Sequence, residues 1–106
     1  MYICIIMCYV DKFIPAIEAL CKKHNVNELY VFGSVLTPRF DDGSDIDFLV
    51  TFHKDNISDY FENFFDFKYA VEDILQRPVD LVEASAIRNK FFLDEVNSTK
   101  RIVYAN

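Results

Sequence analysis

The chain has 106 residues, of which 52% are hydrophobic, and it carries a formal net charge of −6 at pH 7. This length and apolar content suit a single domain over residues 1–106 that buries one core without disulfides or a structural metal. The acidic balance argues against direct binding to nucleic acid, because affinity for a phosphate backbone comes mainly from Lys and Arg.

The N-terminal stretch MYICIIMCYV is apolar, but its ten residues are too few to span a membrane. It also lacks the basic start and the cleavage site of a signal peptide, so we expect a strand or the lead into a helix, and no membrane association. The cysteines Cys4, Cys8 and Cys21 form no C-x-x-C pair. We expect them to be small core residues of a cytoplasmic protein, because reducing compartments keep thiols free.

Apolar residues recur at helical spacing from Asp11 to His24, which predicts a packing helix with Asp11 as its N-cap. Pro15 is compatible with this helix, because a proline in the first turn removes no hydrogen bond. The stretch ELYVFG, residues 28–33, is rich in β-branched and aromatic residues and predicts a strand that ends at Gly33.

A polar loop, too long for a tight hairpin, leads to a second predicted strand at residues 45–53, DIDFLVTFH. Intervals of three and four between apolar residues then predict a long amphipathic helix from Ile57 to Gln76. The remaining predicted elements are a strand at 79–83, a helix around 87–96 and a strand at 101–105. This order predicts an α+β domain in which a small mixed sheet of about four strands has its helices packed on one side.

The long helix contains the aromatic run DYFENFFDFKY. Its spacing predicts one buried stripe that contains Phe61, Phe64 and Phe67. Three further aromatic residues fall off this stripe and predict a contact surface: Tyr60, Phe65 and Tyr69. That surface suits either a partner protein or a homodimer.

Two aspartates of the second strand carry the first indication of chemistry. Asp45 and Asp47 are two residues apart and therefore project from the same face, whereas Ile46 and Phe48 face the core. Like charges at this separation are mutually unfavourable unless a cation lies between them. The pair therefore points to a divalent metal.

Asp80 alternates with apolar neighbours in the strand at 79–83, so the three carboxylates converge if this strand lies beside that of Asp45 and Asp47. Oxygen donors favour Mg²⁺ or Mn²⁺, and His24 and His53 are not needed as ligands. Such a trio can hold two ions, one that grips a triphosphate and one that lowers the pKa of an attacking hydroxyl, as in-line phosphoryl transfer requires.

Gly33 and Ser34 follow the first strand and supply a place where backbone N–H groups and a hydroxyl can approach phosphate oxygens. Asp41 and Asp42 lie in an Asp-Asp-Gly sequence, which is typical of a solvated turn. A calcium loop is excluded, because alignment on its glycine would put a proline and a leucine at ligand positions.

The sequence FGS, a spacer of ten residues and DID, followed later by VDLVE, resembles the minimal nucleotidyltransferases of the DNA polymerase β superfamily over almost the whole chain. The resemblance implies the nucleotidyltransferase fold. It also implies that Asp45, Asp47 and Asp80 are the catalytic and metal-binding residues.

The resemblance further implies that Gly33 and Ser34 hold the nucleotide's phosphates. Many relatives continue after this serine with a small residue, Arg and Gly, whereas here the run is VLTPRF. The arginine is thereby displaced to Arg39, whose guanidinium is still suited to a phosphate.

The implied reaction is a Mg²⁺-dependent transfer of AMP from ATP, or of a nucleotide from another NTP, with two ions per site and Mn²⁺ as a substitute. Family members of this size often act as the antitoxin of a HEPN-domain toxin and add AMP to one of its hydroxyls. The alternative is a non-catalytic binding module of the same fold, which neutralises a partner by complex formation.

Overall fold

The computed structural model describes residues 10–33 and 44–105. Its helices are α2 (Ile14–Lys23), α3 (Tyr60–Leu75) and α4 (Lys90–Thr99), with the 3₁₀ turns η2 (Lys54–Asn56) and η3 (Ala84–Ala86). Its strands are β1 (Val26–Phe32), β2 (Ile46–Phe52), β3 (Val79–Glu83) and β4 (Arg101–Ala105). The predicted order of elements and the α+β class are confirmed.

The strands form one mixed sheet in the order β3-β2-β1-β4. β1 pairs antiparallel with both β2 and β4, whereas β2 and β3 are parallel neighbours. A parallel pair needs a crossover connection, and α3 provides it. The predicted neighbourhood of the second and third strands is therefore present.

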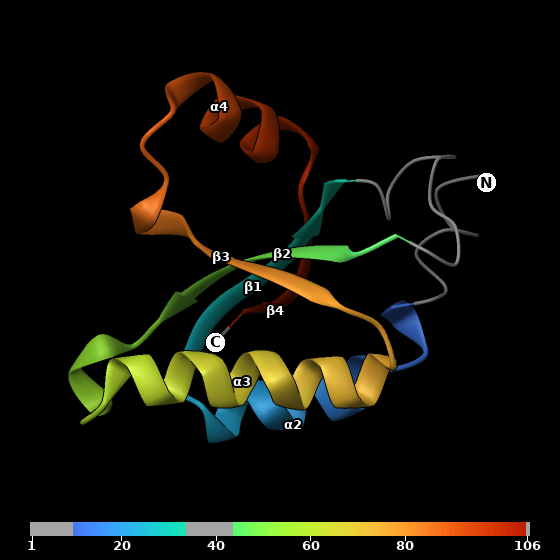
Figure 1. Ribbon diagram of the computed structural model, residues 1–106, viewed down its shortest axis with the longest axis vertical. Helices are drawn as coiled ribbons and strands as arrows, with labels where there is room; N and C mark the ends of the chain where they lie inside the picture. Colours follow the sequence, from blue (N-terminus) through green and yellow to red (C-terminus); the bar gives the residue numbers. More distant parts are fainter. Residues whose placement is uncertain (1–9, 34–43, 106) are drawn as a thin grey trace.

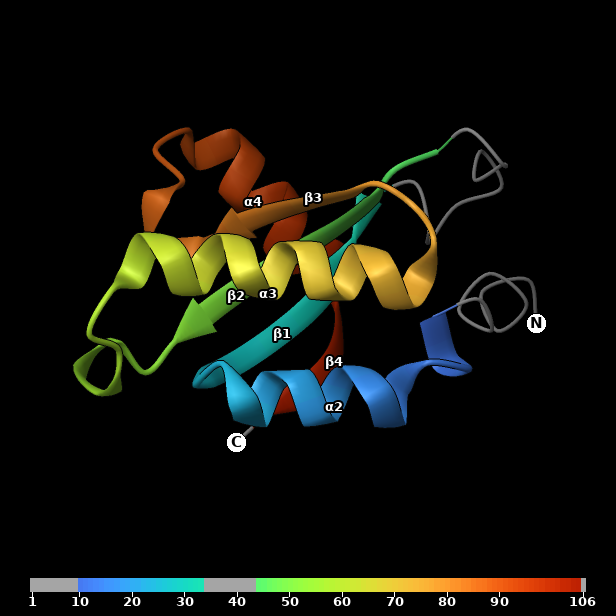
Figure 2. The ribbon, with the colours of Figure 1, turned by 60° about the horizontal axis from the view of Figure 1, so that its bottom comes forward.

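The larger core lies between one face of the sheet and the helices α2 and α3 (Figure 1). Alternate residues of β2 point into this core, so Ile46, Phe48 and Val50 are fully buried. Ile17 of α2 and Phe67 of α3 meet them from the helices. The two helices lie side by side across this face (Figure 2).

Helix α4 lies over the opposite face of the sheet (Figure 1). There Phe32, Leu49 and Val96 form a second, smaller cluster, and the Phe92 ring meets that of Phe32 at 6.1 Å between centroids. The expectation that the helices pack on one side therefore holds for α2 and α3 and not for α4. The apolar residues of β1 and β2 that alternate away from the larger core need a cover of their own.

The helix ends differ from the sequence expectation by a few residues. α2 is preceded by Phe13, which makes no side-chain cap, so Asp11 is not its N-cap, while Pro15 does lie in its first turn. α3 begins after Asp59, whose carboxylate accepts a hydrogen bond from the Glu62 N–H at 3.0 Å. α4 begins after Asn89, three residues later than predicted, because the Asn89 side chain accepts from the N–H of Phe92.

The buried stripe of α3 is turned by one residue relative to the prediction. Phe64 and Phe67 do face the larger core, but Phe61 is 73% exposed, and Tyr60 packs on the core instead. The rings of Phe61, Phe65 and Tyr69 follow one another along the outside of the helix, with centroids 4.9 Å and 5.9 Å apart. We call these three residues the aromatic ladder.

Cys21 is buried, as predicted, and burial, followed by the nearby charge of Glu18, raises the pKa of its thiol to about 12. Cys4 and Cys8 lie outside the described residues. His24 is also a structural residue, because its Nδ1 lies 2.9 Å from the Leu20 carbonyl and its ring packs on Phe67. Within residues 10–33 and 44–105, no helix combines the length and the apolarity that a bilayer crossing requires.

Candidate active site

The aspartates predicted from the sequence lie on the face of the sheet that α4 covers. Ile46 and Phe48 point into the larger core, so Asp45 and Asp47 project from the opposite face. In β3 the residues around Asp80 also face the larger core, which places Asp80 on the α4 side. The three carboxylates therefore share one face.

The register of the parallel pair brings two of these carboxylates next to each other. Asp47 of β2 is the direct partner of Asp80 of β3. Residues opposite each other on adjacent strands project side by side, with Cβ atoms about 5 Å apart. Asp45 lies immediately before β2, two residues from Asp47, and is exposed, as is Asp80.

Gly33 lies beside these carboxylates, because it directly follows Phe32 of β1, the partner of Asp47 in β2. Gly33 has φ +80°, a conformation that L side chains rarely adopt. A Cβ atom at this position would overlap the Asp47 carboxylate oxygen and lie 3.1 Å from its Cγ. Glycine thus lets the backbone at the end of β1 approach the Asp47 carboxylate directly.

The pKa of Asp47 reflects the crowding of the three carboxylates. Burial, then the charge of Asp80, and then that of Asp45 raise the pKa of the Asp47 carboxyl to about 6. Each of these causes disfavours the ionised carboxylate. A positive charge placed among the three groups would oppose these contributions, because it favours the ionised carboxylate.

Two residues that sequence reasoning missed hold the carboxylate-bearing strands in place. Arg77 donates from Nη1 to the carbonyl of Ser44, just before Asp45, at 2.8 Å. Glu72 of α3 accepts a hydrogen bond from the N–H of Val79, the residue before Asp80, also at 2.8 Å. A charged side chain directly before a predicted strand was the only signal for Arg77, and it does not reveal this contact.

The other predicted site residues, Ser34 and Arg39, lie outside the described residues, and so do Asp41 and Asp42. Their predicted roles stay predictions. Of the residues predicted at the nucleotide's phosphates, the structure describes Gly33 alone.

The donor set fits a hard divalent cation in its chemistry. All three side chains offer carboxylate oxygens, the ligands that Mg²⁺ prefers, and the raised pKa of Asp47 marks a place where a cation would be stabilising. In the part of the chain that the structure describes, however, no three His, Cys, Asp or Glu side chains are already grouped closely enough to hold a metal ion. The carboxylates are thus neighbours without being a finished ligand shell.

Comparison with known proteins places these observations in a family. The family described as polymerase beta, nucleotidyltransferase, matches residues 16–106. No curated protein matches the chain.

Several solved structures share its fold. One described as a minimal nucleotidyltransferase is 25% identical, with a TM-score of 0.73 over 87% of this chain and 90% of that one. A toxin-antitoxin crystal structure with AMP-PNP is 19% identical, with a TM-score of 0.67 over 88% and 73% of the two chains. A third, the tri-AMPylated Shewanella oneidensis HEPN toxin in complex with MNT antitoxin, is 18% identical, with a TM-score of 0.62 over 91% and 72%.

The family match runs through both strands that carry the aspartates and through the glycine at the end of β1. The predicted resemblance to minimal nucleotidyltransferases and the predicted fold are confirmed by these comparisons. This chain belongs to the polymerase β nucleotidyltransferase family.

Proposed function

We propose that this chain transfers AMP from ATP to a hydroxyl group of a partner protein in a Mg²⁺-dependent reaction. The observation that carries the proposal is the direct pairing of Asp47 with Asp80 across two parallel strands, on the same face as Asp45. Membership of a transferase family and the oxygen-only donor set support it.

In this proposal each residue has a separate task. Asp45 and Asp47 bind the divalent cation, and Gly33 keeps the space beside them free of a side chain for the triphosphate. Asp80, the exposed carboxylate on β3, accepts the proton of the attacking hydroxyl. The oxygen of that hydroxyl bonds to the α-phosphorus of ATP, and pyrophosphate leaves.

Asp80 also contributes to the cation site, and Ser34 and Arg39 contribute to binding of the phosphates. Mg²⁺, with two ions per site, or Mn²⁺ in its place, would supply charge neutralisation of the triphosphate and a lower pKa of the attacking hydroxyl. ATP or another NTP is the donor.

A HEPN-domain toxin is the acceptor that we propose. Two similar solved structures are described as toxin-antitoxin complexes, one with AMP-PNP and one with an AMPylated HEPN toxin. The net charge of −6 favours a protein acceptor over direct nucleic-acid binding. We further propose that residues 1–106 act as one nucleotidyltransferase domain in the cytoplasm, where ATP is abundant and a buried thiol such as Cys21 stays reduced.

The test is to incubate the chain and a HEPN-domain protein encoded beside it with Mg²⁺ and ATP radiolabelled at the α-phosphate. We expect label on the HEPN protein, and a loss of at least about 1000-fold in rate for Asp47→Asn, because a cation ligand and its charge are removed. Asp55→Asn, the same change at an exposed aspartate in η2, is the matched control and should keep full activity. Equal rates for Asp47→Asn and the wild type would refute the proposed site.

A second candidate function is stoichiometric neutralisation of the partner without turnover. It is favoured by the fact that the carboxylates among the described residues are not yet grouped as a set of metal ligands. A tight complex with the HEPN protein that carries no label, in both the wild type and Asp47→Asn, would establish this alternative.

A further inference from the structure

We propose that the open edge of β3, together with the groove between β3 and α3, binds an extended apolar segment of a partner protein that is flanked by Lys or Arg. The proposal concerns binding and does not depend on nucleotide transfer.

The first observation is the free hydrogen-bonding edge of the sheet. Among the described residues, β3 is the outermost strand on its side of the sheet and pairs with β2 alone. The N–H of Ile46 donates to the carbonyl of Pro78 at 3.1 Å. Every second residue from Pro78 onward therefore directs its backbone hydrogen-bonding groups towards β2. Val79, Leu81 and Glu83 therefore direct their backbone groups to the open edge.

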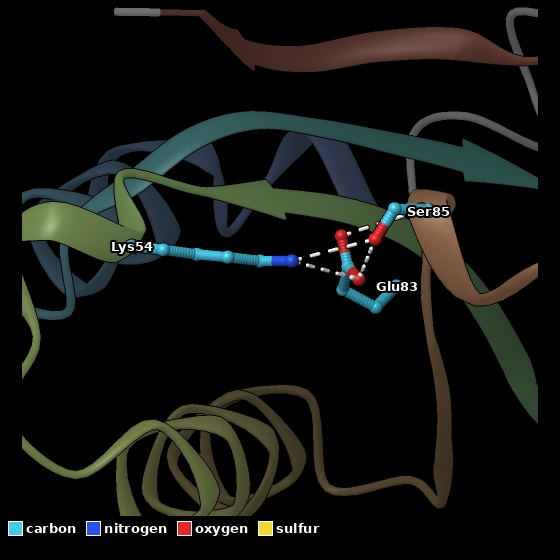
Figure 3. A network of polar contacts seen from close by, with 3 residues as sticks. All are labelled: Lys54, Glu83 and Ser85. Atoms are coloured by element: carbon cyan, nitrogen blue, oxygen red, sulfur yellow. Dashed lines mark hydrogen bonds and ion pairs between the residues drawn. The ribbon is translucent and has the colours of Figure 1, made fainter.

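A carboxylate lies at each end of this edge. At one end, the Glu72 carboxylate takes the N–H of Val79. At the other, the Glu83 carboxylate lies 3.5 Å from Lys54 Nζ and accepts hydrogen bonds from the N–H and the hydroxyl of Ser85, while Lys54 also reaches the Ser85 hydroxyl at 3.4 Å (Figure 3). Between them, the N–H and C=O of Leu81 have no hydrogen-bond partner among the described residues.

The second observation is an apolar groove beside this edge. Its volume is about 430 Å³, and residues of both α3 and β3 line it, among them Phe61, Phe65, Leu81 and Val82. Phe61 is 73% exposed, although a large aromatic side chain normally gains by burial. The Tyr60 hydroxyl, from another lining residue, is shielded from solvent without a partner in the described part of the chain, so the groove also holds an unmet donor.

Edge and groove together define the shape of the occupant. A segment that pairs with β3 projects its residue opposite Leu81 to the same face as Leu81, which is the face of α3 and the groove. The next residue projects to the other face. The occupant is therefore extended, with apolar side chains at every second position, as in recognition by strand addition.

The charges around the groove favour a basic partner over a second copy of this chain. Carboxylates lie at both ends of the edge: Glu72 accepts the N–H of Val79, and Glu83 is one of the residues that line the groove. Lys54, which lies over the ring of the lining residue Tyr60, is already paired with Glu83. Two copies would bring together these carboxylates and two net charges of −6, whereas Lys or Arg beside the apolar segment would meet them with opposite charge.

The edge also leads to the candidate active site, and this step rests on the proposed function. A residue of the bound segment opposite Asp80 would project to the face of Asp80 and Asp47. A hydroxyl side chain at that position would lie next to the carboxylates, one residue away from the apolar side chain opposite Leu81. The groove would then select the sequence around the acceptor hydroxyl.

The binding test uses the ¹⁵N-labelled chain and a synthetic peptide, acetyl-Lys-Leu-Thr-Phe-Thr-Leu-Lys-amide, without ATP or metal. We expect saturable shifts of the amide signals of Leu81 and Glu83. Phe61→Glu should raise Kd by at least about tenfold, because it places a charge in the apolar groove. Phe91→Glu changes another phenylalanine, 86% exposed on α4, and should leave Kd unchanged.

Chemical variants of the peptide separate the contribution of backbone hydrogen bonds from that of charge. Two peptides are N-methylated, one at the odd-numbered and one at the even-numbered residues. One of them should lose binding and the other should keep it, because only every second N–H of the peptide faces β3. Replacement of the terminal lysines by glutamate should weaken binding about tenfold. The binding test contains neither ATP nor metal, so a failed transfer reaction and a failed docking surface are distinguished.

Three results would overturn the proposal: amide shifts centred outside β3 and α3, equal binding of the two N-methylated peptides, or no saturable shift with the unmodified peptide. Concentration-dependent dimerisation that moves the same amide signals without peptide would instead assign this surface to a second copy of the chain.

Discussion

The two faces of the sheet differ in what they bury. On the α2 and α3 side, residues of all four strands and both helices form one continuous core. On the α4 side the buried residues in the described part of the chain are Phe32, Leu49 and Val96, and the same face carries Asp45, Asp47 and Asp80. Stability is concentrated on one face, which leaves the other free to hold charged groups that weaken the fold.

Strand β2 shows how one short sequence serves both purposes. Ile46, Phe48 and Val50 are fully buried on one side, while Asp47 on the other has a pKa raised by burial and by its acidic neighbours. Because side chains alternate along a strand, each aspartate is anchored by the apolar residues next to it. Substitutions that affect the two faces unequally test this division.

The largest stability difference is expected between two aliphatic residues of β2. Ile46→Ala should lower the free energy of unfolding by about 3 to 4 kcal/mol, because it opens a cavity in the continuous core, and Leu49→Ala by about 2 kcal/mol, because the small cluster can collapse around it. Urea denaturation of both variants measures the difference. Equal losses would contradict the division into a structural and a functional face.

The contact between Gly33 and Asp47 comes next. Gly33→Ala should cost about 2 kcal/mol of unfolding free energy, because the new methyl group adds a clash with the Asp47 carboxylate to the strain of a positive φ. Asn25, with φ 59°, has similar backbone geometry. Asn25→Ala is the control for strain alone and should cost about 1 kcal/mol. In denaturant titrations, part of the Gly33→Ala loss should disappear in an Asp47→Ala background.

A smaller effect is expected from pH. The pKa of Asp47 is raised from 3.8 to about 6 in the folded state, so its protonated form is favoured by folding. This stabilisation is complete below pH 3.8 and is lost as the pH rises through about 6. Relative to Asp47→Asn, the wild type should therefore lose about 1 kcal/mol of unfolding free energy between pH 4 and pH 7, since solvent screens a half-exposed carboxylate.

Thermal unfolding of the two proteins at intervals of pH measures this difference. A wild-type protein that gains stability over Asp47→Asn towards pH 7 would contradict the raised pKa. Asp55→Asn, at an exposed carboxylate away from the cluster, controls for net charge.

The smallest effects are expected at the helix caps. Asp59→Ala and Asn89→Ala each remove the side-chain acceptor that caps α3 or α4, at a cost of about 0.5 to 1 kcal/mol. Amide hydrogen-exchange rates should distinguish the two variants. Loss of the Asn89 cap should accelerate exchange in α4 alone, because Val96 is its only buried residue, whereas α3 is held by Phe67, Val71 and Leu75.

Much of this architecture could be predicted from the sequence, because alternation and helical spacing are strong in it. The strands around Asp47 and Asp80 are bounded by polar residues and carry apolar side chains at every second position, so the shared face of the aspartates followed from geometry. That the two strands lie side by side was a condition of the prediction, and no local pattern contains their parallel pairing.

The errors arose where several local patterns compete. In DYFENFFDFKY almost every helical stripe is aromatic, so spacing could not decide whether Tyr60 or Phe61 faces the core; the sheet selects Tyr60, whose ring packs against Phe52. The place of α4 depends on which face of the sheet is still uncovered, which is a tertiary property. Likewise, the hydrogen bond from Arg77 to Ser44 joins residues 33 positions apart and leaves no local signature.

The side-by-side placement of Asp47 and Asp80 depends on the register between β2 and β3. A slip of β3 by one position would keep every helix and strand, yet it would exchange the two sides of the strand and turn Asp80 into the apolar interior. The bonds made by Arg77 and Glu72 at the entry to β2 and β3 oppose such a slip. The length of the short connection after α3 is therefore under the same constraint as the aspartates themselves, and a single-residue insertion there should be as damaging as the loss of a carboxylate.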